Sequence, residues 1–106
     1  MSQWQAMALS WLVELPLLLA LLWRQGVGRV CLFGLLATGL SHPVAWRAVS
    51  YLSPHDYAQG LWTIELGVVL VEAWVLRLGV TRAWGPALGA SAVSNLTSFT
   101  VGCLLW

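Results

Sequence analysis

Charge is what this sequence has least of. Only 8% of its 106 residues are charged, it contains no lysine, and five arginines against four acidic residues leave a formal net charge of +1. Nucleic-acid binding needs a basic patch of clustered Lys and Arg, so we exclude nucleic acid as a partner. A soluble domain carries about 25% charged residues. The shortage of charge therefore also argues against a soluble protein.

Cysteine is scarce as well, and the residue patterns of catalysis are missing. The two cysteines, Cys31 and Cys103, fall near opposite membrane faces in the topology predicted below, so we expect no disulfide between them. The chain offers no nucleophile–base pair and no compact metal motif. We therefore expect neither an enzyme nor a bound cofactor, and leave open whether a metal ion binds.

Long apolar runs are what the sequence does have, since 59% of its residues are hydrophobic. A membrane-spanning helix needs about 20 predominantly apolar residues. Four such runs occupy approximately residues 4–23, 27–46, 61–78 and 84–106. The sequence therefore predicts an all-α bundle of four transmembrane helices, forming one domain over residues 1–106. We expect it in the lipid bilayer of a bacterial or archaeal plasma membrane.

The segments between these runs predict the topology. Residues 24–29 and 79–86 are short and contain glycine, which indicates two antiparallel helical hairpins joined by a longer loop at 47–59. Four of the five arginines flank the two hairpin turns: Arg24, Arg29, Arg77 and Arg82. The positive-inside rule then places both turns in the cytoplasm and both termini outside. Tryptophans near the span ends indicate an interfacial aromatic belt: Trp4, Trp23, Trp46, Trp62, Trp84 and Trp106.

Three glutamates lie inside the apolar runs, Glu14 in the first and Glu65 and Glu72 in the third. A charged side chain at the centre of a membrane helix costs about 2.5–3.5 kcal/mol on insertion scales, and such residues usually mark a functional site. The carboxyls are therefore the strongest functional signal in the chain.

Helical spacing gives each later span a polar or small face. These faces carry Gly34, Thr38 and His42 on the second span, Glu65 and Glu72 on the third, and Ser91 and Asn95 on the fourth. Lipid supplies no hydrogen-bond partners, so we expect these faces to turn toward one another. The predicted proton- or cation-binding site consists of Glu14, Thr38, Glu72 and Asn95, with His42 and Glu65 at its outer mouth.

Two prolines and a row of small residues complete the pattern. Pro16 and Pro43 predict kinks in the outward half of the first two spans, consistent with a cavity reached from outside. On the fourth span, small residues form a stripe that we interpret as a packing face rather than a pore lining. The stripe comprises Ala90, Ser94, Ser98 and Gly102.

The predicted site contains no basic residue that would neutralise its carboxyls, so they are either protonated or hold a cation. A proton relay would lead from Glu65 and His42 to Glu72 or Glu14. A divalent-cation site would use the same groups as oxygen and imidazole ligands. A third interpretation makes the buried polar groups interhelical contacts without further function.

These observations leave two functions open. The first is a small transporter or channel-like subunit that handles protons or a cation through its buried carboxyls. The alternative is a non-catalytic accessory or assembly subunit of a larger membrane complex, favoured by the small size and the small-residue face. In either case we expect a homo-oligomer or a larger membrane-protein partner.

Overall fold

Helices account for all regular structure in the computed structural model, which describes residues 2–105. The long helices are α1 (Gln3–Leu22), α2 (Val27–Ser50), α3 (Tyr57–Leu76) and α4 (Trp84–Leu105). The predicted all-α fold of four helices is therefore confirmed. Met1 and Trp106, the predicted end of the fourth span, lie outside the described residues.

The first helix starts at a capping box and continues through a proline. The hydroxyl of Ser2 accepts a hydrogen bond from the Gln5 amide at 3.2 Å, and the Gln5 side chain accepts one from the Ser2 amide at 3.0 Å. Pro16 lies within the uninterrupted α1, as Pro43 does in α2. Because Pro16 is exposed, the backbone hydrogen bond that its ring removes is lost on the outer surface of the bundle.

Both hairpin turns are short, as predicted. The first is a 3-10 turn, η1 (Trp23–Gln25), followed by Gly26 at φ +109°, which glycine adopts without steric cost. The second is a π-helical turn, η2 (Arg77–Thr81), followed by Arg82 in the left-handed region at φ +60°. Pro86, which was predicted to belong to the turn, lies in the first turn of α4, where a missing amide proton is tolerated.

The connection between α2 and α3 is shorter than predicted. Instead of residues 47–59 it comprises residues 51–56, because α2 continues to Ser50 and α3 already begins at Tyr57. Hydropathy marks where a helix leaves the apolar part of the membrane, whereas the helix itself continues wherever its backbone hydrogen bonds do. Polar residues such as Arg47 and Gln59 therefore extend the helices beyond the apolar runs.

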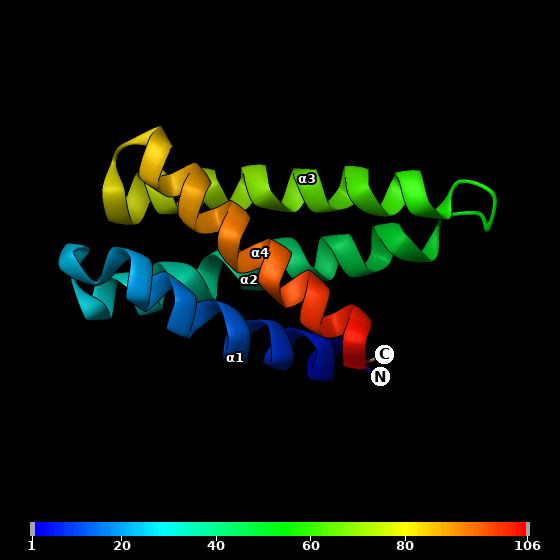
Figure 1. Cartoon of the computed structure of the whole chain (residues 1–106), viewed down its shortest axis with the longest axis horizontal. Helices are drawn as coiled ribbons and strands as arrows, with labels where there is room; N and C mark the ends of the chain where they lie inside the picture. The colour runs from blue at the N-terminus through cyan, green and yellow to red at the C-terminus, as the bar shows by residue number, and fades with distance from the viewer. Residues whose placement is uncertain (1, 106) are drawn as a thin grey trace.

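The helices form a closed ring of antiparallel neighbours (Figure 1). Each packs against two others, in the order α1, α2, α3, α4 and back to α1. Both termini and the α2–α3 connection lie at one end of the bundle, here called the terminal end, and η1 and η2 lie at the other, the turn end. The bundle measures 43 × 24 × 20 Å, and its long axis matches a bilayer of about 40–45 Å including headgroups.

An apolar plug fills the interior at the turn end. It consists of Leu18, Leu22, Val30, Ala73, Leu76, Val80, Ala87 and Ala90. Two glycines of neighbouring elements allow close approach beside it: a Cβ at Gly34 would lie 3.0 Å from a methyl of Leu15, and one at Gly79 would overlap the ring of Phe33. The helices therefore pack tightly where the arginine-containing turns are.

The outer surface of the bundle is apolar. Leu12, Leu66 and Leu104 are 75%, 60% and 81% exposed, as expected of side chains that face lipid. Three segments are long and apolar enough to cross a membrane: Gln3–Gln25, Val27–Ser50 and Trp84–Leu105. This is compatible with an integral membrane protein. The predicted span at 61–78 is not among them; its helix α3 carries Glu65 and Glu72.

Candidate functional site

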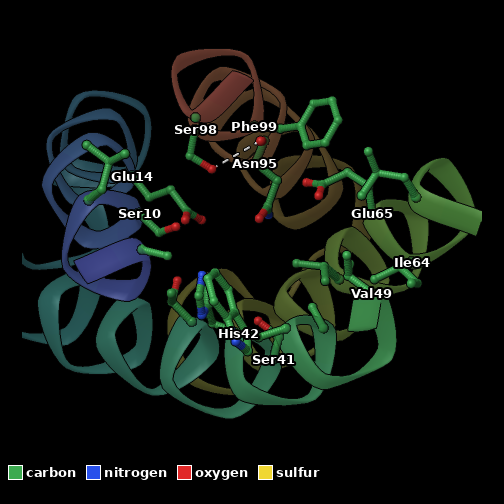
Figure 2. Close-up of a pocket in the computed structure, with 18 of the residues that line it drawn as sticks. Ser10, Glu14, Ser41, His42, Val49, Ile64, Glu65, Asn95, Ser98 and Phe99 are labelled. Carbon is green, nitrogen blue, oxygen red and sulfur yellow. Dashed lines mark hydrogen bonds between the residues drawn. The ribbon is translucent and has the colours of Figure 1, made fainter. Parts of the chain in front are cut away.

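A cavity of about 790 Å³ occupies the interior at the terminal end. All four helices contribute to its wall, and Figure 2 shows polar side chains from each of them pointing into a shared central space. Ligand pockets of proteins have volumes of about 300–1,000 Å³. The cavity is therefore large enough for a small organic molecule.

The six residues predicted for the site all line this cavity. They are Glu14 on α1, Thr38 and His42 on α2, Glu65 and Glu72 on α3, and Asn95 on α4. The polar faces of the helices thus meet, as lipid-facing positions cannot satisfy these groups. The functional roles of the residues remain predictions.

Glu72 is a buried carboxyl with a hydrogen-bond partner on a neighbouring helix. Its side chain is 3% exposed, and Oε1 accepts a hydrogen bond of 2.7 Å from the hydroxyl of Thr38, which links α3 to α2. The other oxygen, Oε2, is buried without a hydrogen-bond partner. A buried acceptor without a partner carries a desolvation cost of about 1–3 kcal/mol, so Glu72 has the capacity to bind a proton donor from the cavity.

Asn95 is oriented by its own helix. Its side-chain amide Nδ2 donates to the carbonyl oxygen of Ser91 at 2.8 Å, while the Ser91 hydroxyl donates to the carbonyl oxygen of Val69 on α3 at 2.7 Å. Ser91 therefore ties α4 to α3 and holds Asn95 against the cavity, where it stands opposite α2 (Figure 2).

The three carboxyls of the cavity interact with one another. Glu14 is 3% exposed and lies in the electrostatic field of both Glu72 and Glu65. Like charges in a shared site disfavour joint ionisation, and none of the described residues that line the cavity is an arginine. The arrangement therefore favours the uptake of protons or of a positively charged ligand.

His42 and Glu65 lie on the terminal side of Thr38 and Glu72, and their role as an outer mouth stays a prediction. Glu65 precedes Glu72 by two helical turns, about 10 Å along α3. The His42 ring stacks on Trp46 with ring centroids 6.1 Å apart and an interplanar angle of 25°. Its Nδ1 is buried without a hydrogen-bond partner, so His42 is part of the cavity wall rather than a solvated end of the helix.

Other lining residues were not predicted. Ser10, Ser41 and Ser98 line the cavity, and Ser41, 7% exposed, has a buried hydroxyl without a partner. The spacing carried a signal for two of them: Ser10 precedes Glu14 by four residues, and Ser41 follows Thr38 by three, both one turn of a helix.

Trp46, assigned to the interfacial belt, also lines the cavity, and the belt itself stays a prediction. One sequence-based interpretation needs correction. The small stripe of α4 divides: Ala90 and Ser94 are buried in the bundle, whereas Ser98 and Gly102 line the cavity. The stripe faces inward along its length because α4 crosses the space between α1 and α3, so a packing face and a cavity lining follow each other along one helix (Figure 1).

The remaining predictions concern cysteine and metal. Cys31 and Cys103 are free thiols, and Cys103 is exposed and lines the cavity. Over the described range 2–105, no group of three or more His, Cys, Asp or Glu side chains is arranged to hold a metal ion.

No protein-family model, curated protein or solved structure matches this chain.

Proposed function

We propose that this protein is a small integral membrane transporter, or channel-like subunit, that handles protons or a cation through the cavity. One observation carries the proposal: three carboxyls line a single cavity whose wall contains no arginine, and one of the two most buried, Glu72, has one oxygen free of hydrogen bonds. Carboxyls at membrane depth are costly and usually functional, and this arrangement gathers three of them along one cavity.

We propose further that all four helices cross the membrane. α3 has 20 residues, enough for a span, and it packs between α2 and α4. Its outer face carries apolar side chains such as Trp62, Leu66 and Leu70, which are 57%, 60% and 51% exposed. Its two carboxyls line the cavity, Glu72 buried at 3% exposure and Glu65 partly buried. With the arginine turns in the cytoplasm, the cavity faces outward.

The plug argues for a carrier rather than an open pore. A cation that enters the cavity passes Glu65, reaches Glu72 and meets the plug at Leu76, one helical turn further along α3. Passage to the other side therefore requires rearrangement of the packing at the turn end. A binding position between alternately closed halves is how many secondary transporters work.

Proton movement by purified protein in lipid vesicles tests the proposal. An imposed pH gradient is followed with a pH-sensitive dye trapped inside the vesicles. We expect dissipation of the gradient to fall at least tenfold in Glu72→Gln and in Glu14→Gln, because an amide cannot exchange a proton. Asp56→Asn is the matched control, since Asp56 is the one acidic residue that does not line the cavity. Unchanged flux in both glutamine variants would refute proton handling.

The accessory-subunit alternative is supported by a different surface. Gly85 and Gly89 lie one turn apart on the outside of α4, and a Cβ added to either would meet nothing within 4 Å. Small residues at such spacing allow close helix–helix approach in membranes. If the protein is an accessory subunit, Gly89→Leu should abolish a stoichiometric complex seen by native mass spectrometry. Isolated protein should then show no flux.

A further inference from the structure

The cavity is much larger than an inorganic ion requires. A Ca²⁺ or Mg²⁺ ion draws its ligands to within about 2.0–2.6 Å. At about 30 Å³ per water molecule, a volume of about 790 Å³ has room for roughly 25 waters. Much of the wall is apolar, including Leu61, Ile64 and Val68 on α3 and Phe99 on α4. A bare ion would leave these walls without contacts, whereas a ligand with a hydrocarbon body would cover them.

Two buried polar atoms in the wall lack partners at the deep part of the cavity. Oε2 of Glu72 is an acceptor on α3, and the Ser41 hydroxyl on α2 is both donor and acceptor. Both side chains are more than nine-tenths buried, with exposures of 3% and 7%. An ammonium group carries several N–H donors and a positive charge, so it satisfies both oxygens and reduces repulsion between Glu72 and Glu14.

Aromatic side chains line the cavity nearer to the terminal end than Glu72 and Glu14 do. Trp46 on α2, Tyr57 on α3 and Phe99 on α4 all line the cavity, and Phe99 is labelled beside Glu65 in Figure 2. Aromatic faces attract cations through their quadrupole and cover hydrocarbon surface at the same time. Carboxyls at depth and rings near the mouth therefore match a ligand with a cationic head and an apolar body.

We propose that the cavity binds an organic ammonium cation, whose head lies between Glu72, Glu14 and Ser41 and whose body contacts the apolar and aromatic walls. The inference rests on the proposed function and names the class of cation. The ammonium group belongs either to a free amine or to the headgroup of an aminophospholipid, and both present the same chemistry to the carboxyls.

Calorimetric titration of the full-length protein in phosphatidylglycerol nanodiscs, whose lipid contains no ammonium, tests this proposal. Benzylammonium is the probe at pH 7, and benzyl alcohol is its neutral counterpart of nearly equal size. We expect saturable binding of benzylammonium and at least tenfold weaker binding of benzyl alcohol. Equal binding of the two would overturn the proposal, because the cavity would then select for apolar surface and not for charge.

Variants locate the binding position. Glu72→Gln should weaken benzylammonium binding at least tenfold and Ser41→Ala about threefold, with helix content unchanged by circular dichroism, whereas Asp56→Asn should bind like the parent protein. In a Cys31→Ser background, benzylammonium should also slow alkylation of Cys103, which lines the cavity. Binding that survives Glu72→Gln and leaves Cys103 alkylation unchanged would contradict the site.

Nanodiscs containing phosphatidylethanolamine distinguish the two sources of the ammonium group. Loss of benzylammonium binding in these discs assigns the site to a lipid headgroup, and unchanged binding assigns it to a free amine. Absence of benzylammonium binding alongside Glu72-dependent proton flux overturns the ammonium proposal and leaves the proposed function intact. Absence of both binding and flux overturns both.

Discussion

The two ends of the bundle are built from the same four helices and differ in what faces inward. At the turn end, aliphatic and small side chains such as Leu76, Val30 and Ala87 fill the interior and are at most 1% exposed. At the terminal end the inward positions carry carboxyls, hydroxyls and aromatic rings around a cavity of about 790 Å³. Packing and binding are therefore separated along the length of the molecule.

This separation has an energetic consequence. Inside a membrane, helices associate through close packing more than through a hydrophobic driving force, because lipid tails are as apolar as leucine. The plug supplies that packing, so the terminal end can keep a cavity and unpaired polar atoms without loss of the fold. Substitutions at the two ends are expected to affect stability and binding differently.

The largest effect on stability is expected in the plug. Leu76 is 1% exposed, and Leu76→Ala should lower the free energy of unfolding by about 2–3 kcal/mol, near the lower limit for buried leucines because lipid replaces water outside the bundle. Reversible unfolding in detergent mixtures measures the change. Leu78→Ala, at a site 60% exposed, should stay within about 0.5 kcal/mol. Similar losses in the two variants would show that the plug does not support the fold.

The second largest loss of stability is expected when a larger side chain is introduced beside the plug. A Cβ at Gly34 would lie 3.0 and 3.1 Å from methyl groups of Leu15 and Leu18, so Gly34→Val should separate α1 from α2 and cost about 1–3 kcal/mol. Thermal unfolding followed by tryptophan fluorescence reports the shift. Gly89→Val is matched to it in helix propensity and meets nothing within 4 Å. An equal loss of stability in Gly89→Val would show that the change in helix propensity from glycine to valine, and not crowding against Leu15 and Leu18, causes the effect.

A smaller change in stability is expected in the cavity. Glu72→Gln keeps the size of the side chain, and the amide oxygen can still accept the hydrogen bond from Thr38. The free energy of unfolding should therefore change by about 1 kcal/mol or less, although flux and binding are lost. Chemical unfolding of the two proteins side by side measures this. A loss as large as that of Leu76→Ala would mean that the carboxyl mainly holds the helices together.

The smallest effect concerns the hydrogen bond from Thr38 on α2 to Glu72 on α3. Thr38→Val removes the 2.7 Å bond to Glu72 while keeping the shape of the side chain. Hydrogen bonds between membrane helices average about 0.6 kcal/mol in double-mutant cycles, and we expect a coupling of this size between Thr38→Val and Glu72→Ala. A coupling above about 2 kcal/mol would show that the bond, and not the plug, positions α3.

Two features could not be predicted from the sequence: where the helices end, and that one face of α4 has two different surroundings. The α2–α3 loop was predicted too long because Arg47 and Gln59 look like loop residues by hydropathy, although either is acceptable in a helix. The stripe on α4 was interpreted as one face with one role. Its division between Ser94, which is buried, and Ser98, which lines the cavity, depends on how the neighbouring helices diverge.

The sequence by itself determined the helical class, the number of helices, the short turns and the meeting of polar faces. Apolar runs of about 20 residues and polar groups at helical spacing allow few other arrangements, because unsatisfied polar groups are too costly in lipid. Only the tertiary structure decided that the turn end is filled and the terminal end hollow. Whether a space is filled depends on side chains from four helices meeting at one level, and spacing along a single helix does not contain that information.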